Sequence, residues 1–327
     1  MLAEPSNRYF YSILGFAKRI LLLGRSLNLN LIKLEGRTTN GEDEFLLFYL
    51  GELETLTYLK RLLFSNVTDD VQDVFPFWEL RKKLKRVSLS NKVIVVEINR
   101  ILNVLVPKGG FQTFPWIKQK APVNSNMFKR RKGKIEDVYG RKIRQNQYSF
   151  RISRDEDAVV RFHHSFYVPY VSSKYRDLTS LRSMGEIQAA ARSGFLLQVF
   201  DQDQWVSGLV CEIKGETVRA VAGGLIDDHQ YHLKRGAASA CEYFLFKWAQ
   251  DNSIKTIDFL RSRPNLQDGV YEFKRKWGAY PEKDIWPHTS LWIFVPNGLD
   301  IPAIMKKQLV WHKKRFVELG RMTNKHN

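Results

Sequence analysis

A run of small residues next to basic side chains is the stretch of this sequence best suited to hold an anion. It reads Lys234-Arg235-Gly236-Ala237-Ala238-Ser239 and stands before a segment with helical spacing. A turn of small residues that opens a helix leaves backbone N–H groups without intrahelical partners, and these groups favour a phosphate or pyrophosphate. Arg235 adds a fixed positive charge. We predict a phosphate-binding bend here, with a tightly packed helix start and no ligand as the alternative.

Two acids shortly before this bend, Asp227 and Asp228, are candidates for acid–base work. They follow the apolar segment that ends near Leu225, so they lie where a strand is expected to end. A carboxylate in that place can take a proton from a reacting amine. Solvated acids in a turn are the alternative interpretation.

Metal and disulfide chemistry have little support in the sequence. Only Cys211 and Cys241 occur, which is fewer cysteines than a zinc site or a disulfide scaffold needs. The adjacent His163 and His164 point in different directions on a helix, so they do not form a metal pair. We therefore expect no metal, two buried thiols in a reducing compartment, and a cytoplasmic protein.

The elements that would position these residues are three short strands followed by a helix. Apolar runs at 195–200, 205–213 and 217–222 are separated by polar turns, a pattern typical of an antiparallel meander. From Ala240 to Trp248 the apolar spacing becomes that of a largely buried helix. A further apolar run at 254–260 predicts another short strand.

Two motifs after that helix carry a family resemblance. They read Ile257-Asp258-Phe259-Leu260-Arg261 and Tyr271-Glu272-Phe273-Lys274-Arg275-Lys276-Trp277-Gly278. Together with the order of meander, small-residue turn, helix and strand, they resemble the GNAT-fold acyltransferases, in the branch of FemAB-like aminoacyl transferases and CelD-like acetyltransferases. The resemblance covers about residues 130–290. Two positions depart from the family pattern: Leu233 stands where the phosphate loop has Gln or Arg, and Arg261 replaces a glycine.

The resemblance implies a fold class and a division into domains. The fold class is α/β (α+β), with a GNAT-like, mixed and mainly antiparallel sheet flanked by helices, in two tandem units of which the second is complete. The expected domains are a degenerate GNAT-like unit at 1–122, a basic linker or helix at 123–150, the acyltransferase domain at 151–297, and a basic amphipathic helix at 298–327. Segments 157–175 and 181–192 correspond to the first two helices of the second unit.

The resemblance also implies a donor, which is acyl-CoA and in the simplest case acetyl-CoA. The backbone of one strand would orient this donor, at Ala222, Gly223, Gly224 and Leu225. The bend described above would hold its phosphates, at Arg235, Gly236, Ala237, Ala238 and Ser239. Tyr271 would return a proton to the leaving thiolate, and Lys274 would neutralise acceptor phosphate or developing charge.

Four further residues fall on the acceptor side of the resembling site: His163, Tyr167, Asp258 and Arg261. His163 or its neighbour His164 is an alternative base to the two aspartates. A structural ion pair between Lys274 and Asp258 is the alternative to a catalytic role for Lys274.

The charge of the chain predicts an anionic partner. The net charge is +18 and the pI is near 9.8. Residues 81–151 hold 19 Lys or Arg and three acids, with the densest run at 129–144. A phosphorylated donor or acceptor, an anionic membrane surface and nucleic acid such as tRNA all fit this charge, and no RNA-binding motif accompanies it. A solvated linker is the alternative for the basic run.

The first 120 residues alternate strand and helix patterns. Strands are predicted at 27–34, 44–50, 92–98 and 101–106, and helices at 52–64 and 74–86. Segments 7–26 and 304–321 are basic and amphipathic, which suits packing on a domain or peripheral docking at the inner face of a membrane. The apolar stretch at 10–23 is interrupted by Lys18 and Arg19 and falls short of the ~20 residues that cross a bilayer.

These patterns predict an acyltransferase. It would move an acyl group from acyl-CoA or a related carrier to an amine of a phosphorylated or sugar-type acceptor. Such chemistry needs an oriented donor, a route for the amine proton and an N–H group that polarises the carbonyl. The alternatives are a FemAB-like transferase that uses aminoacyl-tRNA, and a catalytically silent basic adaptor on a membrane or nucleic acid.

Overall fold

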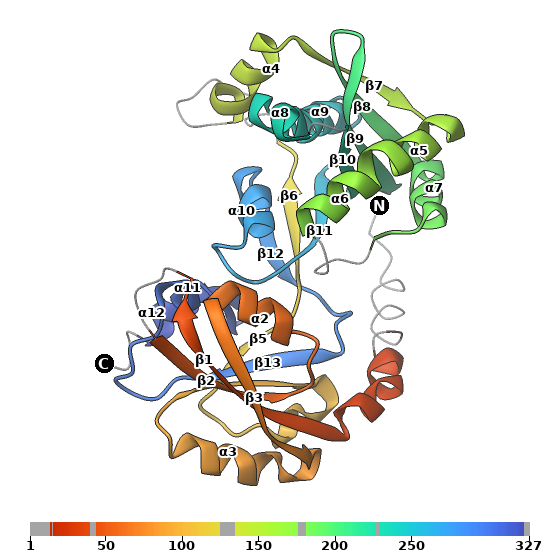
Figure 1. The fold of residues 1–327 in the computed structure, drawn as a ribbon. Coiled ribbons are helices and arrows are strands. Elements are labelled where there is room, and N and C mark those ends of the chain that lie inside the picture. The colour runs from red at the N-terminus through yellow and green to blue at the C-terminus, as the bar shows by residue number, and fades with distance from the viewer. Residues whose placement is uncertain are drawn as a thin grey trace. The chain divides into compact units, whose positions relative to one another are not determined.

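The chain divides into two compact units, each made of segments that are distant in sequence. The structure is a computed structural model, and it describes residues 14, 16–39, 44–124, 135–175, 181–226 and 229–323. Unit 1 comprises Met1–Ile117, Arg261–Glu272 and Pro281–Asn327, and unit 2 comprises Lys118–Leu260 and Phe273–Tyr280. Figure 1 shows the elements of both units.

Unit 1 is built on a six-stranded sheet in the order β3-β1-β2-β4-β13-β5. Its strands are β1 (Asn28–Thr38), β2 (Glu44–Gly51), β3 (Phe64–Pro76), β4 (Val93–Asn99), β5 (Phe111–Thr113) and β13 (Thr289–Phe294). Neighbouring strands are antiparallel except β2 and β4, which pair in parallel. The sheet thus receives β13 from far along the chain, between β4 and β5.

Alternating residues of this sheet face two apolar layers. Val93 and Val95 of β4 pack in a cluster with α2 (Leu56–Leu63), whereas Ile94 and Val96 pack with α3 (Leu80–Ser88). The first layer also takes residues of α11 (Ala303–Lys306) and α12 (Leu319–Thr323). Because both faces of β4 are covered, its sequence is apolar almost throughout.

Unit 2 is built on a seven-stranded sheet in the order β12-β6-β11-β10-β9-β8-β7. The strands are β6 (Ile117–Pro122), β7 (Tyr148–Ser153), β8 (Gly194–Asp201), β9 (Gln204–Lys214), β10 (Thr217–Leu225), β11 (Thr256–Ser262) and β12 (Tyr280–Lys283). Strands β7 to β10 pair with one another antiparallel, and β11 joins β10 in parallel.

The helices of unit 2 cover both faces of this sheet. They are η4 (Glu136–Gly140), α4 (Arg141–Gln145), α5 (Glu156–Phe162), η5 (His163–Tyr167), α6 (Val168–Tyr175), α7 (Met184–Arg192), α8 (His229–Arg235), α9 (Ala237–Asp251) and the second half of α10 (Gly269–Lys276), whose residues up to Glu272 belong to unit 1. Of these, η4 and η5 are π-helical turns.

The two faces can be assigned from neighbouring residues of the meander. A Cβ atom on Gly224 would lie 2.7 Å from the backbone of Phe166, and one on Gly208 would lie 2.9 Å from the Phe162 ring, so this face carries α5 and η5. Ser207 comes directly before Gly208 and points to the other face, where its Oγ lies 3.0 Å from Cys241 Sγ of α9. Helices α5 and α9 therefore cover opposite faces of the sheet.

The predicted fold class is confirmed, because two mainly antiparallel sheets are flanked by helices. The predicted meander, the buried helix and the strand after it are β8, β9, β10, α9 and β11. Among the described elements of the first 120 residues, three predictions need correction. Segment 101–106 forms the 3-10 helix η3 (Arg100–Leu105), the helix predicted from residue 74 begins at Leu80, and the strand β3 was missed.

The single helix predicted at 298–327 is also wrong. The described part of this segment forms α11, the hairpin of β14 (Leu309–His312) with β15 (Arg315–Glu318), and α12. Val310 and Leu319 are both buried in unit 1, so the apolar residues that suggested one amphipathic helix belong to a folded hairpin and its flanks. Part of the predicted helix at 7–26 lies outside the described residues.

The predicted domain boundaries and the structural units also differ. The domain predicted at 151–297 includes β13, which pairs with β4 and β5 in the sheet of unit 1. Such long-range pairing leaves no local signal in the sequence. No helix among the described residues is long and apolar enough to span a membrane.

Candidate active site at the opening between β10 and β11

The central feature of unit 2 is a bulge in β10. Its pairing with β9 shifts register between Ala220 and Ala222, so Val221 is an extra residue without a partner on β9. A bulge bends its strand and turns a peptide group out of the ladder. The carbonyl of Val221 is such a group, and it accepts a hydrogen bond from Arg182 Nε at 3.2 Å.

At this bulge β10 also separates from its other neighbour. The parallel pairing with β11 covers only Thr217–Arg219 against Thr256–Asp258. Beyond Arg219, β10 continues to Leu225 along β9 alone. In an antiparallel pair alternate residues direct their N–H and C=O groups away from the partner, so Ala222–Leu225 presents such groups on the side where β11 no longer pairs with β10. We call this unpaired edge of β10 the opening.

Four residues predicted to orient the donor lie on this part of β10: Ala222, Gly223, Gly224 and Leu225. Gly224 has a packing role as well, because its lack of a side chain lets the backbone of η5 approach β10. Gly223 is exposed and a Cβ there would meet only ordinary contacts, the nearest at 3.6 Å. β10 therefore has an edge at Ala222–Leu225 that does not pair with β11. The small residues there let neighbouring groups come close to the backbone.

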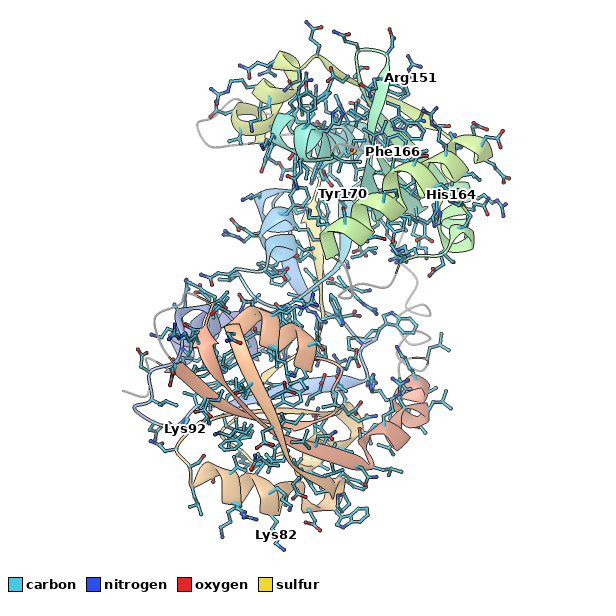
Figure 2. The ribbon with its side chains drawn as sticks, viewed as in Figure 1. Lys82, Lys92, Arg151, His164, Phe166 and Tyr170 are labelled. Carbon is cyan, nitrogen blue, oxygen red and sulfur yellow. The ribbon has the colours of Figure 1, made fainter. Side chains whose placement is uncertain are left out.

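The two predicted acceptor-side residues of η5 hold the segment that carries Arg182. Tyr167 Oη accepts a hydrogen bond from the backbone N–H of Arg182 at 3.0 Å, and His163 Nε2 lies 3.2 Å from the Arg182 carbonyl. The Nδ1 atom of His163 is buried and has no hydrogen-bond partner among the described residues. Figure 2 shows His164 and Phe166 in the same turn. Both predicted residues thus position Arg182 toward the bulge.

The bend at 235–239 differs from the prediction in its surroundings. A further helix, α8, lies between β10 and α9, and Gly236 joins α8 to α9 with a φ of +89°. That backbone conformation favours glycine. Ala237 is fully buried, whereas Ala238 and Ser239 are half-buried. A Cβ on Gly236 would lie 3.7 Å from Lys142 Cδ, so a lysine of α4 lies beside the bend.

The side chain of Arg235 already has three partners. It forms an ion pair with Asp201 at 2.8 Å, donates to Asn146 Oδ1 at 2.8 Å and donates to the Tyr231 hydroxyl at 2.6 Å. These contacts join α8 to β8 and to the residue after α4. Asp227 and Asp228, the predicted bases, lie outside the described residues.

A hollow of about 560 Å³ lies beside the contacts that Arg235 makes. Its lining includes Gln147, which follows the Arg235 partner Asn146, together with Tyr148 and Phe244. The side chain of Lys247 also lines it, together with an ion pair between Arg144 and Glu136. The hollow therefore combines aromatic surface with positive charge.

Three of the predicted residues have structural partners. Asp258 Oδ1 accepts the N–H of Leu260 at 2.8 Å, and Leu260 has a φ of +61°. Arg261 pairs with the fully buried carboxylate of Asp284 in unit 1. Tyr271 is buried in an apolar cluster of unit 1 with Phe114, Ile117 and Leu309.

Lys274 belongs to a group of side chains that act on one another electrostatically, and the sequence did not single out the other members. Tyr170 and Lys174 come from α6, Glu242 comes from α9, and Lys274 comes from α10. We call these four residues the opening cluster. Lys174 Nζ donates to Tyr170 Oη at 2.7 Å and also lies 5.1 Å from the centre of that ring. The one sequence signal for Glu242 is an acid between Cys241 and Tyr243, within an otherwise apolar stretch of the helix pattern.

Electrostatics link the members of this cluster. Burial raises the pKa of Glu242 to about 8, and the positive charges of Lys174 and Lys274 oppose this rise. Burial also raises the pKa of Tyr170 to about 12, with a further contribution from Glu242. A carboxyl group that titrates near neutral pH is suited to proton transfer.

Both cysteine thiols are free and buried, as the sequence predicts. Burial raises the pKa of Cys211 and of Cys241 well above the ordinary range. Because the thiolate is the reactive form, neither residue is suited to act as a nucleophile.

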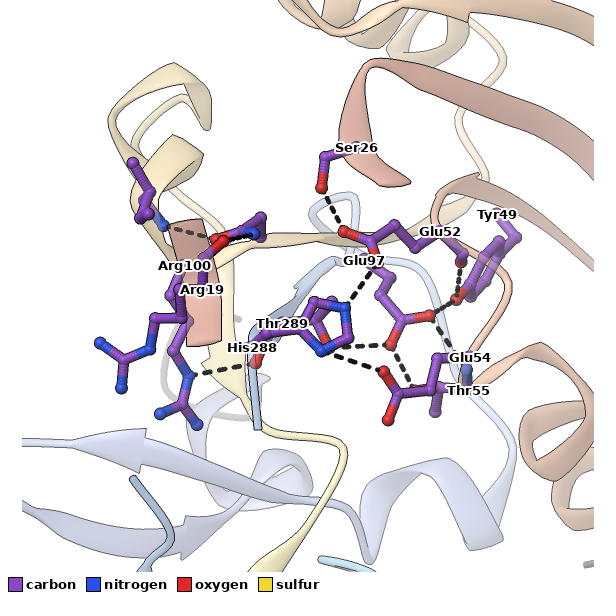
Figure 3. Close-up of polar contacts among 12 residues, drawn as sticks. Arg19, Ser26, Tyr49, Glu52, Glu54, Thr55, Glu97, Arg100, His288 and Thr289 are labelled. Atoms are coloured by element: carbon purple, nitrogen blue, oxygen red, sulfur yellow. Dashed lines mark hydrogen bonds and ion pairs between the residues drawn. The ribbon is translucent and has the colours of Figure 1, made fainter. Parts of the chain in front are cut away.

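A second polar cluster lies in unit 1 (Figure 3). Both oxygens of the fully buried Glu97 accept hydrogen bonds, from Thr55 Oγ1 at 2.5 Å, Thr289 Oγ1 at 3.1 Å, the Thr55 N–H at 3.0 Å and the Tyr49 hydroxyl. Glu52 takes a hydrogen bond from Ser26 and lies 2.8 Å from His288 Nε2. Because these carboxylate oxygens all have partners, the cluster serves the fold of unit 1.

No family model matches the chain, and no curated protein matches it. Among solved structures, the chain is similar to "L-PGS from Bacillus licheniformis" with a TM-score of 0.40 and 9% identity, over 90% of this chain and 93% of that one. It is similar to FemX with a TM-score of 0.39 and 12% identity, over 80% and 83%. It is similar to a GCN5-related N-acetyltransferase from Sphaerobacter thermophilus with a TM-score of 0.35 and 11% identity, over 78% and 75%.

Proposed function

We propose that this protein is an acyltransferase that moves an acyl group from a carrier thioester to an amine at the opening of unit 2. The observation that carries the proposal is the separation of β10 from β11 beyond Arg219, next to a bulge in β10. An extended donor with amide groups fits such a strand edge, because it can pair with backbone groups as an added strand would. The amides of the pantetheine arm of acyl-CoA have this character.

The phosphates of the donor would lie near the start of α9. Lys142 beside Gly236 supplies a positive charge there, and the N–H groups that open α9 favour an anion. Lys247 adds a positive charge at the neighbouring hollow, where Arg144 is paired with Glu136. Arg235 is engaged by Asp201 and Asn146, so its role in this proposal is to fix the bend rather than to bind phosphate directly.

Acyl transfer to an amine needs few protein groups. The thioester carbonyl needs a backbone N–H that polarises it, and an N–H of β10 turned toward the opening can supply this. The amine needs a proton acceptor within reach. Holding both reactants in one place provides much of the remaining acceleration. Lys274 lies in the opening cluster and would stabilise negative charge that develops there.

The net charge of +18 favours an anionic acceptor, such as an amine on a phosphorylated sugar or lipid. Acetyl-CoA is the first donor to examine, followed by other acyl-CoAs, acyl carrier protein and aminoacyl-tRNA. A thermal-shift series on the full chain tests the proposal. A donor that binds only the folded state at 100 times its Kd adds about 2.7 kcal/mol of stability.

The second measurement is transfer itself. Free thiol release and the mass of the acylated product are followed with amino sugars, their phosphates and amine-bearing phospholipids as acceptors. Donor-dependent stabilisation together with product supports the proposal. Absence of any donor shift, combined with steeply salt-dependent binding to RNA or anionic vesicles, would replace it with the basic adaptor.

A further inference from the structure

One carboxylate oxygen of Glu242 on α9, Oε2, is buried without a hydrogen-bond partner among the described residues. Leaving such an atom without a partner costs stability, so native proteins rarely retain one without a reason. A ligand that donates a hydrogen bond to Oε2 would supply that reason.

The location of Glu242 explains how a ligand would reach it. Helices α5, η5 and α6 follow one another on one face of the sheet, and α9 covers the opposite face. Cys241, the residue before Glu242, lies 3.0 Å from Ser207 Oγ, and that hydroxyl donates to the Gly224 carbonyl of β10 at 3.2 Å, so this part of α9 lies beside the end of β10. The backbone of η5, which leads into α6, lies against Gly224 on the other face, so both helices approach β10 along the segment that β11 leaves unpaired. Figure 2 shows Tyr170 on α6.

The groups that face Glu242 come from three elements. Tyr170 and Lys174 belong to α6, Lys274 belongs to α10, and Cys241 is its neighbour on α9. The end of α10 packs against α9, because the rings of Trp277 and Phe246 stack at 5.8 Å. The only negative charge among these groups is the Glu242 carboxylate, and the positive charges of Lys174 and Lys274 act on it.

We propose that Glu242 is the catalytic residue that takes the proton from the acceptor amine, with Oε2 as the accepting atom. This inference rests on the proposed acyl transfer. The amine would donate a hydrogen bond to Oε2 and direct its lone pair at the carbonyl of a donor lying along β10.

The two lysines decide the form in which the amine binds. Their positive charges disfavour a third cation, so they select a neutral amine over an ammonium ion. They also favour the ionised form of Glu242 against the effect of its burial. Both effects lead to a neutral nucleophile beside a carboxylate base.

The proposed transfer converts a thioester and an amine into an amide and a thiol. The amine nitrogen forms a bond to the carbonyl carbon of the thioester, and the carbon–sulfur bond breaks with its electron pair going to sulfur. One proton passes from nitrogen to Glu242 Oε2. When that proton moves on to the thiolate, the carboxylate is regenerated, and the products are an amide and a thiol.

Three variants of the full chain test this role. Glu242→Gln keeps the shape and removes the base, and Glu242→Ala leaves space for a small carboxylate. Asp251→Asn is the matched control, because Asp251 is an exposed acid at the end of the same helix. The expected result is a fall in kcat/KM of roughly 100-fold or more for both Glu242 variants and no change for the control. Formate should restore part of the activity of Glu242→Ala, which a purely structural role would not allow.

The outcomes separate the inference from the function on which it depends. If the wild type transfers acyl groups and Glu242→Gln keeps the same rate and pH profile, the proton-acceptor role is overturned. If the wild type neither binds nor uses any donor, the acyl-transfer proposal itself fails. The wild-type profile adds a measurement that needs no variant: kcat/KM should rise with pH as a group near 8 ionises, and a flat profile would contradict the inference.

Discussion

Lys174 and Tyr170 lie one helical turn apart on α6, and the ammonium group of the lysine donates a hydrogen bond of 2.7 Å to the phenol oxygen. This contact holds the Lys174 ammonium group against a buried tyrosine, although the lysine residue as a whole is exposed. The positive charge of Lys174 therefore acts on Glu242.

Removing this charge should change the pH dependence of transfer. Lys174 lowers the pKa of Glu242, so Lys174→Met should raise it and move the rising limb of kcat/KM to higher pH. Lys174→Arg keeps the charge and should leave the limb close to its wild-type position. If kcat/KM of Lys174→Met rises at the same pH as in the wild type, Lys174 does not act on the reacting groups. The pH profiles of the three proteins provide the comparison.

Lys274→Ala should abolish transfer and leave the protein folded. The lysine lies on α10 in the opening cluster, and we propose that it stabilises developing negative charge. Circular dichroism and thermal melting report folding, and product formation reports transfer. Normal turnover would remove Lys274 from the site, whereas loss of folding would assign it to structure.

Gly224→Ala should destabilise unit 2. The new Cβ would lie 2.7 Å from the backbone of Phe166, which cannot move aside as a flexible side chain can. Overpacking of this kind costs about 1–3 kcal/mol. Gly185→Ala is the control, because nothing lies within 4 Å of its Cβ position on α7 and alanine suits a helix. Urea unfolding should show a loss for the first variant only, and equal midpoints would disprove the close approach.

Arg235→Ala should act on stability more than on donor binding. The arginine has three partners, Asp201, Asn146 and Tyr231, and loss of such hydrogen bonds costs roughly 1–3 kcal/mol. Lys142→Ala should weaken donor binding and leave stability near the wild-type value. Denaturation curves and donor titrations of both variants test this contrast. If Arg235→Ala instead weakens donor binding and Lys142→Ala lowers stability, Arg235 would be the residue that binds the donor phosphates.

Glu97 should make unit 1 lose stability as the pH rises. Burial raises the pKa of Glu97 from 4.5 to about 7, against the hydrogen bonds from Thr55 and Tyr49. The folded state then holds a proton that the unfolded state releases, so this contribution is fully present below about 4.5 and is lost as the pH passes 7. Replacing Glu97 with glutamine removes the titration. Between pH 5 and pH 8 the free energy of unfolding of the wild type should fall relative to that of the variant, by on the order of 3 kcal/mol. If the difference in stability between the two proteins does not change with pH, the prediction for Glu97 is wrong.

Much of unit 2 could be predicted from the sequence because its signals are local. Polar turns separate the apolar runs of β8, β9 and β10, and the change of period marks α9. The bend at Gly236 was also visible, since a glycine there allows a positive φ. The intervening helix α8 was missed, because basic residues and a small-residue turn describe a loop and a short exposed helix equally well.

The remaining features depend on distant pairing. Nothing near β13 indicates that it inserts between β4 and β5, and the exposed polar residues of β3 give no alternation to read. Glu242 looks like an ordinary helix acid in the sequence, and only the fold shows that its Oε2 is shielded from solvent and that the charges of Lys174 and Lys274 act on it. The sequence therefore predicts the strand that would orient a donor, but not the group that we propose accepts the proton.

Hydrogen–deuterium exchange with and without acetyl-CoA, and then with the other donors, tests the central claim most directly. An extended donor bound along β10 should slow exchange of the amides between Ala220 and Ile226 that point away from β9, while the paired amides of β8 change little. Protection confined to other segments, or identical exchange with every donor at saturating concentration, would contradict an acyl-donor site at the opening.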